Sequence, residues 1–156
     1  MNKSLFLIIV LILFVSPFGL GQSAEAEIDS MMNRWHRAAA AADYNAFFGA
    51  IDDDGEYLGT EAYERWTKNE FMIWAKPFFD RGKAWDFKAL KRNIRINKSG
   101  DFAWFDEYLD TWMGTCTASG VLVRKDTGWF IKHYHLSVTV PNSLINDFIT
   151  LIKAGK

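Results

Sequence analysis

The chain contains very little cysteine: Cys116 is the only one among its 156 residues. A lone thiol excludes an intramolecular disulfide, so the folded state must depend on a hydrophobic core. Long runs of lysine and arginine are absent as well, and the formal net charge is −1. Because proteins bind phosphate backbones through clustered positive charge, the sequence does not indicate a nucleic-acid partner.

No apolar stretch is long enough to span a bilayer, which takes about 20 residues. The longest one, Leu5–Val15, follows Lys3 and ends at Ser16-Pro17, ahead of small residues around Gly21. This arrangement is typical of a secretory signal peptide. We therefore predict a signal peptide over residues 1–21, cleavage after Gly21, and export to the periplasm or the extracellular space. Cleavage would remove one lysine and no acidic residue, so the mature domain, residues 22–156, has a formal charge of −2. With no cysteine beside the cleavage site, we expect no membrane anchor.

The first half of the mature chain has helical periodicity. Apolar residues between 24 and 42 recur at intervals of three and four: Ile28, Met31, Met32, Trp35, Ala38, Ala39 and Ala42. Asp43 is a candidate cap for a short second helix that ends at Phe48. Thr67 and Glu70 have the spacing of a capping box, which predicts a further helix that Pro77 kinks or ends early.

From Trp85 onward the apolar period changes to two. Four predicted strands, residues 85–97, 102–113, 115–124 and 129–140, are joined by short turns and form an antiparallel meander. Apolar residues at helical spacing after Asn142 predict a C-terminal helix whose apolar face must dock on some other surface. Helices followed by strands, without alternation, indicate the α+β class. A curved antiparallel sheet that buries one face under the N-terminal helices would enclose a cone.

Three parts of the sequence resemble one known family. They are Gly59-Thr60-Glu61 with Glu64-Arg65-Trp66-Thr67 and Lys76-Pro77-Phe78-Phe79, then Ala103-Trp104-Phe105-Asp106-Glu107, and then Gly120-Val121-Leu122-Val123 continuing through Trp129 to Leu136-Ser137 and Pro141-Asn142. They are similar to the SnoaL-like branch of the nuclear transport factor 2-like superfamily, over essentially the whole mature chain. The resemblance implies a cone-shaped α+β barrel with an apolar cavity, and a homodimer that packs through the outer face of the sheet. It does not imply one activity, because members include cyclases, isomerases, dehydratases and oligomerisation modules.

His133 and His135 lie two residues apart on the fourth predicted strand, so their side chains share one face. We expect His135 to be a general acid or base in the cavity near Asp106, because imidazole titrates near neutral pH and a carboxylate can orient it. The alternative is a hydrogen-bonded histidine in the core or at an interface. We expect no metal at this pair, since only His36, Asp106 and Cys116 could add ligands and none has the spacing of a motif.

Asp106 and Glu107 are neighbours on a strand and must face opposite ways. One of them is expected to face inward among nearby aromatic residues, where loss of water contact would suit it to proton transfer. Asp106 is our candidate for that catalytic role. The alternative, favoured by the frequency of structural ion pairs, is a buried acid that is held by Arg65, Arg92 or Arg95.

The residues expected to bind a ligand are mostly aromatic. They are Tyr57, Trp66, Trp74, Trp104, Tyr108 and His133. The segment from Asp52 to Glu61 has part of the spacing of a calcium-binding loop. However, Ala50 stands at the first ligand position, so we interpret the segment as a turn. Nothing in the sequence around Cys116 would activate its thiol, and we interpret it as a core residue.

Three functions remain open at this point. The first is an exported binding domain whose aromatic cone holds a small, mostly apolar ligand. The second is an isomerase, cyclase or dehydratase in which His135 or Asp106 is the base and Tyr57 or Tyr108 donates a hydrogen bond to a developing enolate. The third is a homodimeric interaction module with a filled cone and an apolar sheet face. None of them requires a cofactor, and we favour the first.

Overall fold

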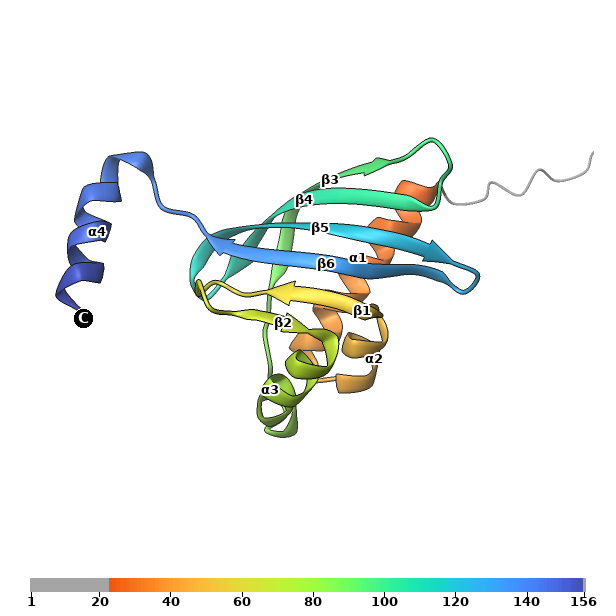
Figure 1. Ribbon diagram of the computed structural model, residues 1–156, viewed down its shortest axis with the longest axis horizontal. Coiled ribbons are helices and arrows are strands. Elements are labelled where there is room, and N and C mark those ends of the chain that lie inside the picture. The colour runs from red at the N-terminus through yellow and green to blue at the C-terminus, as the bar shows by residue number, and fades with distance from the viewer. Residues whose placement is uncertain (1–22, 156) are drawn as a thin grey trace, which may run out of the picture.

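The computed structural model describes residues 23–155. The predicted signal peptide and its cleavage site after Gly21 lie outside the described residues. Within them, helices and strands follow one another as expected for an α+β domain (Figure 1).

The first two helices begin at side-chain caps. α1 (Ala24–Ala40) begins after Ser23, whose hydroxyl oxygen accepts a hydrogen bond from the backbone nitrogen of Ala26 at 3.2 Å. α2 (Tyr44–Gly49) begins after Asp43, whose carboxylate accepts from the backbone nitrogen of Ala46 at 3.0 Å. Each cap satisfies a backbone donor that the helix itself leaves unpaired. The predicted cap at Asp43 is confirmed.

The third helix begins at the predicted capping box. In α3 (Lys68–Asp80), the backbone nitrogen of Glu70 donates to the Thr67 hydroxyl at 3.4 Å, and the Thr67 nitrogen donates to the Glu70 carboxylate at 2.9 Å. Pro77 does not end the helix, which continues to Asp80. Gly82 follows that end with a φ of 81°, a conformation that glycine adopts without strain.

Six strands form one curved sheet in the order β2-β1-β6-β5-β4-β3. They are β1 (Ile51–Leu58), β2 (Arg65–Thr67), β3 (Lys88–Ile96), β4 (Phe102–Thr111), β5 (Gly114–Lys125) and β6 (Gly128–Val138). Strands β3 to β6 pair antiparallel in chain order, which confirms the predicted meander. β1 joins the meander through a parallel pairing with β6, and β2 pairs antiparallel with β1.

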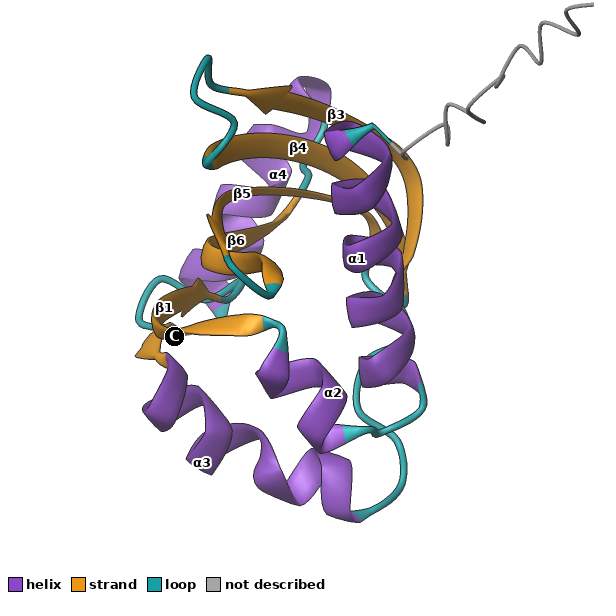
Figure 2. Ribbon diagram, turned by 90° about the vertical axis from the view of Figure 1, so that its right-hand side faces the viewer, coloured by secondary structure: helices purple, strands orange, loops and turns teal. Residues whose placement is uncertain are grey.

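The core lies between the concave face of the sheet and helices α1 to α3 (Figure 2). Strand β4 shows which face is inside, because its residues alternate between buried and exposed. Ala103, Phe105, Glu107 and Leu109 are buried, whereas Phe102, Trp104, Asp106 and Tyr108 are exposed. Cys116 is fully buried, as interpreted. The predicted α+β cone, with N-terminal helices packed in a curved sheet, is therefore confirmed.

The C-terminal helix extends away from the sheet (Figure 1). It is α4 (Ile145–Ala154), and a 3-10 turn, η1 (Asn142–Leu144), precedes it. Its apolar side chains, among them Phe148, Leu151 and Ile152, are exposed. The helix forms as predicted, but within the described residues it does not bury its apolar face on the fold. No helix of the described part of the chain is both long and apolar enough to cross a bilayer.

Candidate ligand-binding site

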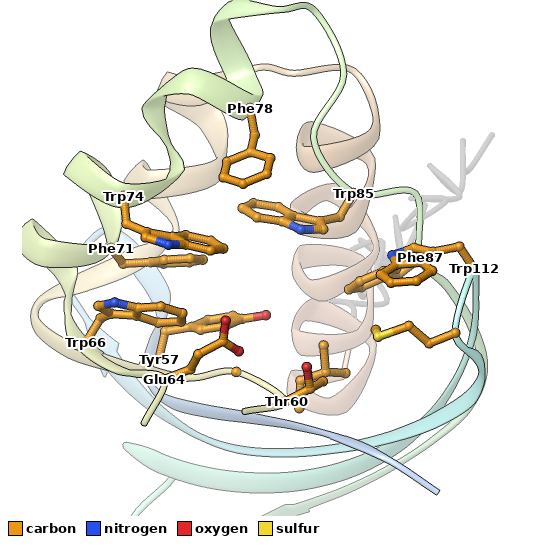
Figure 3. A pocket seen from close by; sticks show the side chains of 13 residues that line it. Tyr57, Thr60, Glu64, Trp66, Phe71, Trp74, Phe78, Trp85, Phe87 and Trp112 are labelled. Atoms are coloured by element: carbon orange, nitrogen blue, oxygen red, sulfur yellow. The ribbon is translucent and has the colours of Figure 1, made fainter. Parts of the chain in front are cut away.

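A cavity of about 270 Å³ lies between α3, the β1–β2 edge of the sheet and the turn that joins β4 to β5 (Figure 3). It is lined by Tyr57, Gly59, Thr60, Glu64, Trp66, Phe71, Trp74, Phe78, Trp85, Phe87, Trp112, Met113 and Leu136. Eight of these thirteen residues are aromatic. Ligand pockets in proteins typically have volumes of about 300 to 1,000 Å³, so this one suits a small molecule.

Several segments that are distant in the sequence supply the aromatic rings. Phe71, Trp74 and Phe78 lie three and four residues apart on α3 and therefore project from one side of that helix. Tyr57 comes from β1, and Trp85 comes from the segment that precedes β3. The cavity therefore forms only when α3, the β1–β2 edge and the rest of the sheet have assembled.

The rings on the α3 side of the cavity are stacked (Figure 3). The ring centroids of Tyr57 and Phe71 are 4.1 Å apart with 18° between the planes, and those of Trp66 and Phe71 are 5.4 Å apart. The rings of Trp74 and Trp85 are nearly parallel, with 6° between the planes. Because such contacts stabilise aromatic pairs beyond the burial of their surface, this wall is well packed without a ligand.

The Tyr57 hydroxyl is a hydrogen-bonding group of the cavity. The hydroxyls of Tyr44 and Tyr134 donate to protein acceptors, at 3.1 Å and 3.0 Å. Among residues 23–155, by contrast, the hydroxyl of Tyr57 has no such partner, and it points into the cavity (Figure 3). Burial, and then the negative charge of Glu64, raises the pKa of the Tyr57 hydroxyl well above its ordinary value. It is therefore a neutral donor at physiological pH, available to a ligand.

Glu64 is the second polar group of the cavity, and it lies in the loop between β1 and β2. Its Oε2 atom accepts a hydrogen bond from the backbone nitrogen of Glu61 at 3.1 Å. Its backbone carbonyl accepts from the nitrogen of Gly59 at 2.9 Å. These two contacts fold the loop back on itself, and they place the carboxylate beside the Tyr57 ring (Figure 3).

A buried network of polar side chains lies deeper in the cone, centred on Glu107. One carboxylate oxygen, Oε1, lies 2.9 Å from Nε2 of His36 and accepts a hydrogen bond from the Tyr134 hydroxyl at 3.0 Å. The other, Oε2, accepts from Nε of Arg92 at 2.8 Å and lies 2.7 Å from its terminal nitrogen. Arg92 also forms an ion pair with Asp29 of α1. The network therefore ties the first helix to β3, β4 and β6.

The charge state of Glu107 follows from these partners. Burial alone would raise its pKa, but the hydrogen bond and charge interaction with His36, together with the positive charge of Arg92, hold the pKa of this carboxyl below its ordinary value. Burial and the negative charge of Glu107 raise the pKa of the Tyr134 hydroxyl. At neutral pH the network thus contains a carboxylate, a guanidinium and a neutral phenol.

A narrow recess separates this network from the cavity. It is lined by Trp35, His36, Ala39, Phe47, Tyr57, Trp85, Phe87 and Tyr134, and its volume is about 10 Å³. Tyr57, Trp85 and Phe87 also line the cavity, so the two spaces adjoin. A volume of about 10 to 15 Å³ holds roughly one water molecule, so His36 faces a space that a ligand atom could enter only after side chains move.

Residues 28–141 match the SnoaL-like domain. The chain belongs to the SnoaL-like family. This confirms the resemblance seen in the sequence. No curated protein matches this SnoaL-like chain.

Solved structures similar to this SnoaL-like domain include an NTF2-like protein of unknown function from Pseudomonas putida KT2440. Its TM-score is 0.63 and its sequence identity 17%, over 78% of this chain and 92% of that one. ActVI-ORFA from Streptomyces coelicolor gives a TM-score of 0.59 at 17% identity, over 72% of this chain and 95% of that one. A candidate ketosteroid isomerase from Parabacteroides distasonis ATCC 8503 gives a TM-score of 0.58 at 19% identity, over 73% of this chain and 86% of that one. At such identities the likeness establishes a shared fold and no activity.

Three of the six predicted ligand residues line the cavity of the SnoaL-like domain: Tyr57, Trp66 and Trp74. The other three lie on the outer face of the sheet and need correction. Trp104 and Tyr108 are 47% and 46% exposed on β4, and His133 is directed toward Glu56, with 4.0 Å between Nδ1 and the carboxylate. The reason is the alternation of strand side chains: Phe105, Glu107 and Tyr134 occupy the inner positions, so their neighbours face outward.

The two predicted catalytic residues also lie outside the cavity. Asp106 is exposed and accepts a hydrogen bond from the side-chain amide of Asn93 at 2.7 Å. His135 is exposed on β6, with its Nε2 atom 3.3 Å from the Ser137 hydroxyl. Ser119 of β5 pairs with both residues and so separates them by one strand. Their expected place in the cavity is therefore corrected, again because they hold the outward positions of their strands.

The cavity and network residues that the predicted site left out include Glu64, Trp85, His36 and Glu107. Glu64 and Trp85 lie in irregular segments, where no periodicity marks the inward side. His36 follows Met32 by four residues and so lies on the buried stripe of α1, a signal that could have placed it inside. The alternative interpretation of the Asp-Glu pair, an acid held by an arginine, does describe Glu107 with Arg92.

Proposed function

We propose that this SnoaL-like domain binds a small, largely apolar molecule in its aromatic cavity. The observation that carries this proposal is the lining of the cavity, in which eight aromatic residues surround a few convergent polar groups. Apolar surface drives a ligand into such a site, and the polar groups orient it. We also propose that binding takes place outside the cytoplasm, which the apolar run at residues 5–15 supports.

Titration of the purified protein with N-phenyl-1-naphthylamine, a neutral dye that emits more strongly in apolar surroundings, tests the binding proposal. We expect a saturable rise in emission. Trp112 lines the cavity and is 81% exposed, so its replacement by alanine should weaken dye binding about three- to tenfold without unfolding the protein. Tyr63, also 81% exposed but outside the cavity, provides the matched control, Tyr63→Ala. Absence of saturable binding, or equal weakening by both variants, contradicts the proposal.

Proton-transfer catalysis is a second candidate, and the pairing of His36 with Glu107 favours it. A carboxylate 2.9 Å from an imidazole nitrogen holds the ring in one orientation. The Tyr57 hydroxyl lies in the adjoining cavity and could donate to a developing enolate oxygen. Because the recess beside His36 is so small, the imidazole would act through a bound water.

The likeness to a candidate ketosteroid isomerase supplies a test substrate for this second candidate: a β,γ-unsaturated ketone, whose conjugated isomer absorbs in the ultraviolet. Catalysis predicts turnover that His36→Asn abolishes and His133→Asn, on the outer face of the sheet, preserves. Turnover that survives in the His36 variant, or none in the wild type, counts against this candidate.

We also propose that two copies associate through the outer face of the sheet. Phe102, Trp104 and Tyr108 are exposed there on one strand, and contiguous exposed apolar surface is a feature of interaction sites. Sedimentation velocity should find a dimer for the wild type and a monomer for Trp104→Glu, with Tyr63→Glu remaining dimeric. A monomeric wild type rules this assembly out.

A further inference from the structure

The cavity contains a single charged residue. Of the thirteen residues that line it, only Glu64 is charged, and no lysine, arginine or histidine is among them. A neutral ligand would remove water from the Glu64 carboxylate without replacing the lost interactions, which is unfavourable. A cationic ligand would replace them. The charge of the lining therefore favours a positively charged occupant over a neutral or negative one.

Glu64 has no basic partner among the described residues, in contrast to two carboxylates of the preceding strand, β1. Glu56 pairs with Arg65 at 2.6 Å, and Asp53 pairs with Lys68 at 3.0 Å. Within residues 23–155 no lysine, arginine or histidine forms an ion pair with Glu64, and the hydrogen-bond donor to its carboxylate is the Glu61 backbone nitrogen. A carboxylate that accepts a single neutral hydrogen bond keeps most of its acceptor capacity for a ligand.

Gly59 makes room for this carboxylate. A Cβ atom at position 59 would lie 2.1 Å from Oε2 of Glu64, which is far inside van der Waals contact. Any side chain there would push the carboxylate away from its place beside the cavity. The obstructed atom, Oε2, is the end of a flexible side chain, and the backbone hydrogen bond from the Gly59 nitrogen to the Glu64 carbonyl does not depend on it. Position 59 thus offers a way to move the charge without removing it.

The aromatic residues around Glu64 complement a cation as well. The faces of tryptophan rings carry negative potential and attract cations within about 6 Å of the ring centroid, and Trp66, Trp74 and Trp85 all line the cavity. Figure 3 shows the Trp85 ring lying across the hollow from the side where Glu64 lies. The negative charge of Glu64 also acts on the Tyr57 hydroxyl, where it adds to burial in raising the pKa. Ring faces and carboxylate therefore act in the same direction.

We propose that the cavity selects a small organic cation, a substituted ammonium group whose charge lies against Glu64 and whose alkyl groups contact the aromatic rings. This inference rests on the proposed binding function and narrows it from apolar molecules in general to apolar molecules with one positive charge. A protonated amine can donate directly to the carboxylate, whereas a quaternary ammonium group uses the charge and the ring faces alone.

Choline and 3,3-dimethylbutan-1-ol test the inference, because they have the same shape and differ only in a charged nitrogen or a neutral carbon. Isothermal titration calorimetry of the purified protein should give choline the higher affinity, by about tenfold or more. Glu64→Gln keeps the shape of the side chain and should remove that preference. Glu61→Gln, the same charge change on a side chain that does not line the cavity, should keep it. Gly59→Ala should reduce it, because the carboxylate is displaced.

Each outcome decides between the two proposals. Equal affinity for the two probes, or a choline preference that persists in Glu64→Gln, overturns the cation inference and leaves apolar binding in place. If neither probe binds but the neutral naphthylamine dye does, the cation inference again fails alone. If no probe binds, both proposals fail. A choline preference that Glu64→Gln and Gly59→Ala lower and Glu61→Gln preserves establishes the inference.

Discussion

Glu107 and Glu64 both face the interior of the cone, yet their surroundings are opposite. Glu107 is 1% exposed, and His36, Arg92 and Tyr134 all contact its carboxylate. Glu64 is partly exposed at the cavity and receives one hydrogen bond, from a backbone nitrogen. A carboxylate whose acceptor sites are filled by the fold holds elements together. One whose sites are open has capacity for a ligand instead.

The difference also determines how each group contributes to stability. A buried charge is tolerated only when nearby groups compensate for the water it has lost. Glu107 has that compensation, and Arg92, with 2% of its side chain exposed, depends on Glu107 in turn. No buried basic side chain of the described residues depends on the charge of Glu64 in this way. Changes at the two positions should therefore separate stability from binding.

The largest effect is expected for Glu107→Gln. Removing one partner of a buried ion pair costs about 3 to 5 kcal/mol, and we expect the lower end because Asp29 still pairs with Arg92. The free energy of unfolding in urea measures this cost. Asp106→Asn is the matched control one residue away. The Asp106 side chain is exposed, so this substitution should change the free energy of unfolding by no more than about 0.5 kcal/mol. Similar costs for the two variants would mean that the assignment of inner and outer faces is wrong.

A smaller effect is expected on acidification. The pKa of Glu107 is lower in the folded state than in the unfolded chain, so its contribution is complete above the unfolded value of about 4.3. That contribution decreases as the pH falls through this value toward the folded pKa. The pKa values of Asp52, Glu70 and Asp101 are also lowered in the folded state. The wild type should therefore lose stability as the pH falls below about 5, because several carboxyls contribute to the loss. The Glu107→Gln variant should lose less over the same range, and parallel stability curves for the two proteins would refute the role given to Glu107.

The sequence predicted those parts of the fold that depend on local signals. The α1 periodicity, the Asp43 cap and the capping box at Thr67 and Glu70 all involve residues within one or two helical turns, so the pattern determines them. The turns between β3 and β6 are equally local. Tyr57, Trp66 and Trp74 could be assigned to the cavity only on residue type, because large aromatic side chains line cores and pockets alike.

The inner face of β4 could not be predicted from the same kind of pattern. Both alternating sets contain aromatic residues, with Phe105 on one face and Trp104 and Tyr108 on the other, and a shift of one residue exchanges the two sets. What decides the face is the meeting of Glu107 with Arg92 of β3 and His36 of α1, which are far away in the sequence. Glu64 was missed for a different reason: it lies in a loop, where no period relates one residue to the next.

The smallest effect on stability is expected for Glu64→Gln. A small effect would distinguish this carboxylate from Glu107, which the fold requires. The side-chain oxygen of glutamine can still accept the hydrogen bond from the Glu61 nitrogen, and neutralising a carboxylate without a basic partner removes a solvation cost instead of breaking an ion pair. We therefore expect the free energy of unfolding in urea to change by less than about 0.5 kcal/mol, against a loss several times larger for Glu107→Gln. A destabilisation above about 1 kcal/mol would show that the fold itself uses the Glu64 charge. In that case the charge would not be free for a ligand, and the proposed selection of cations would lose its physical basis.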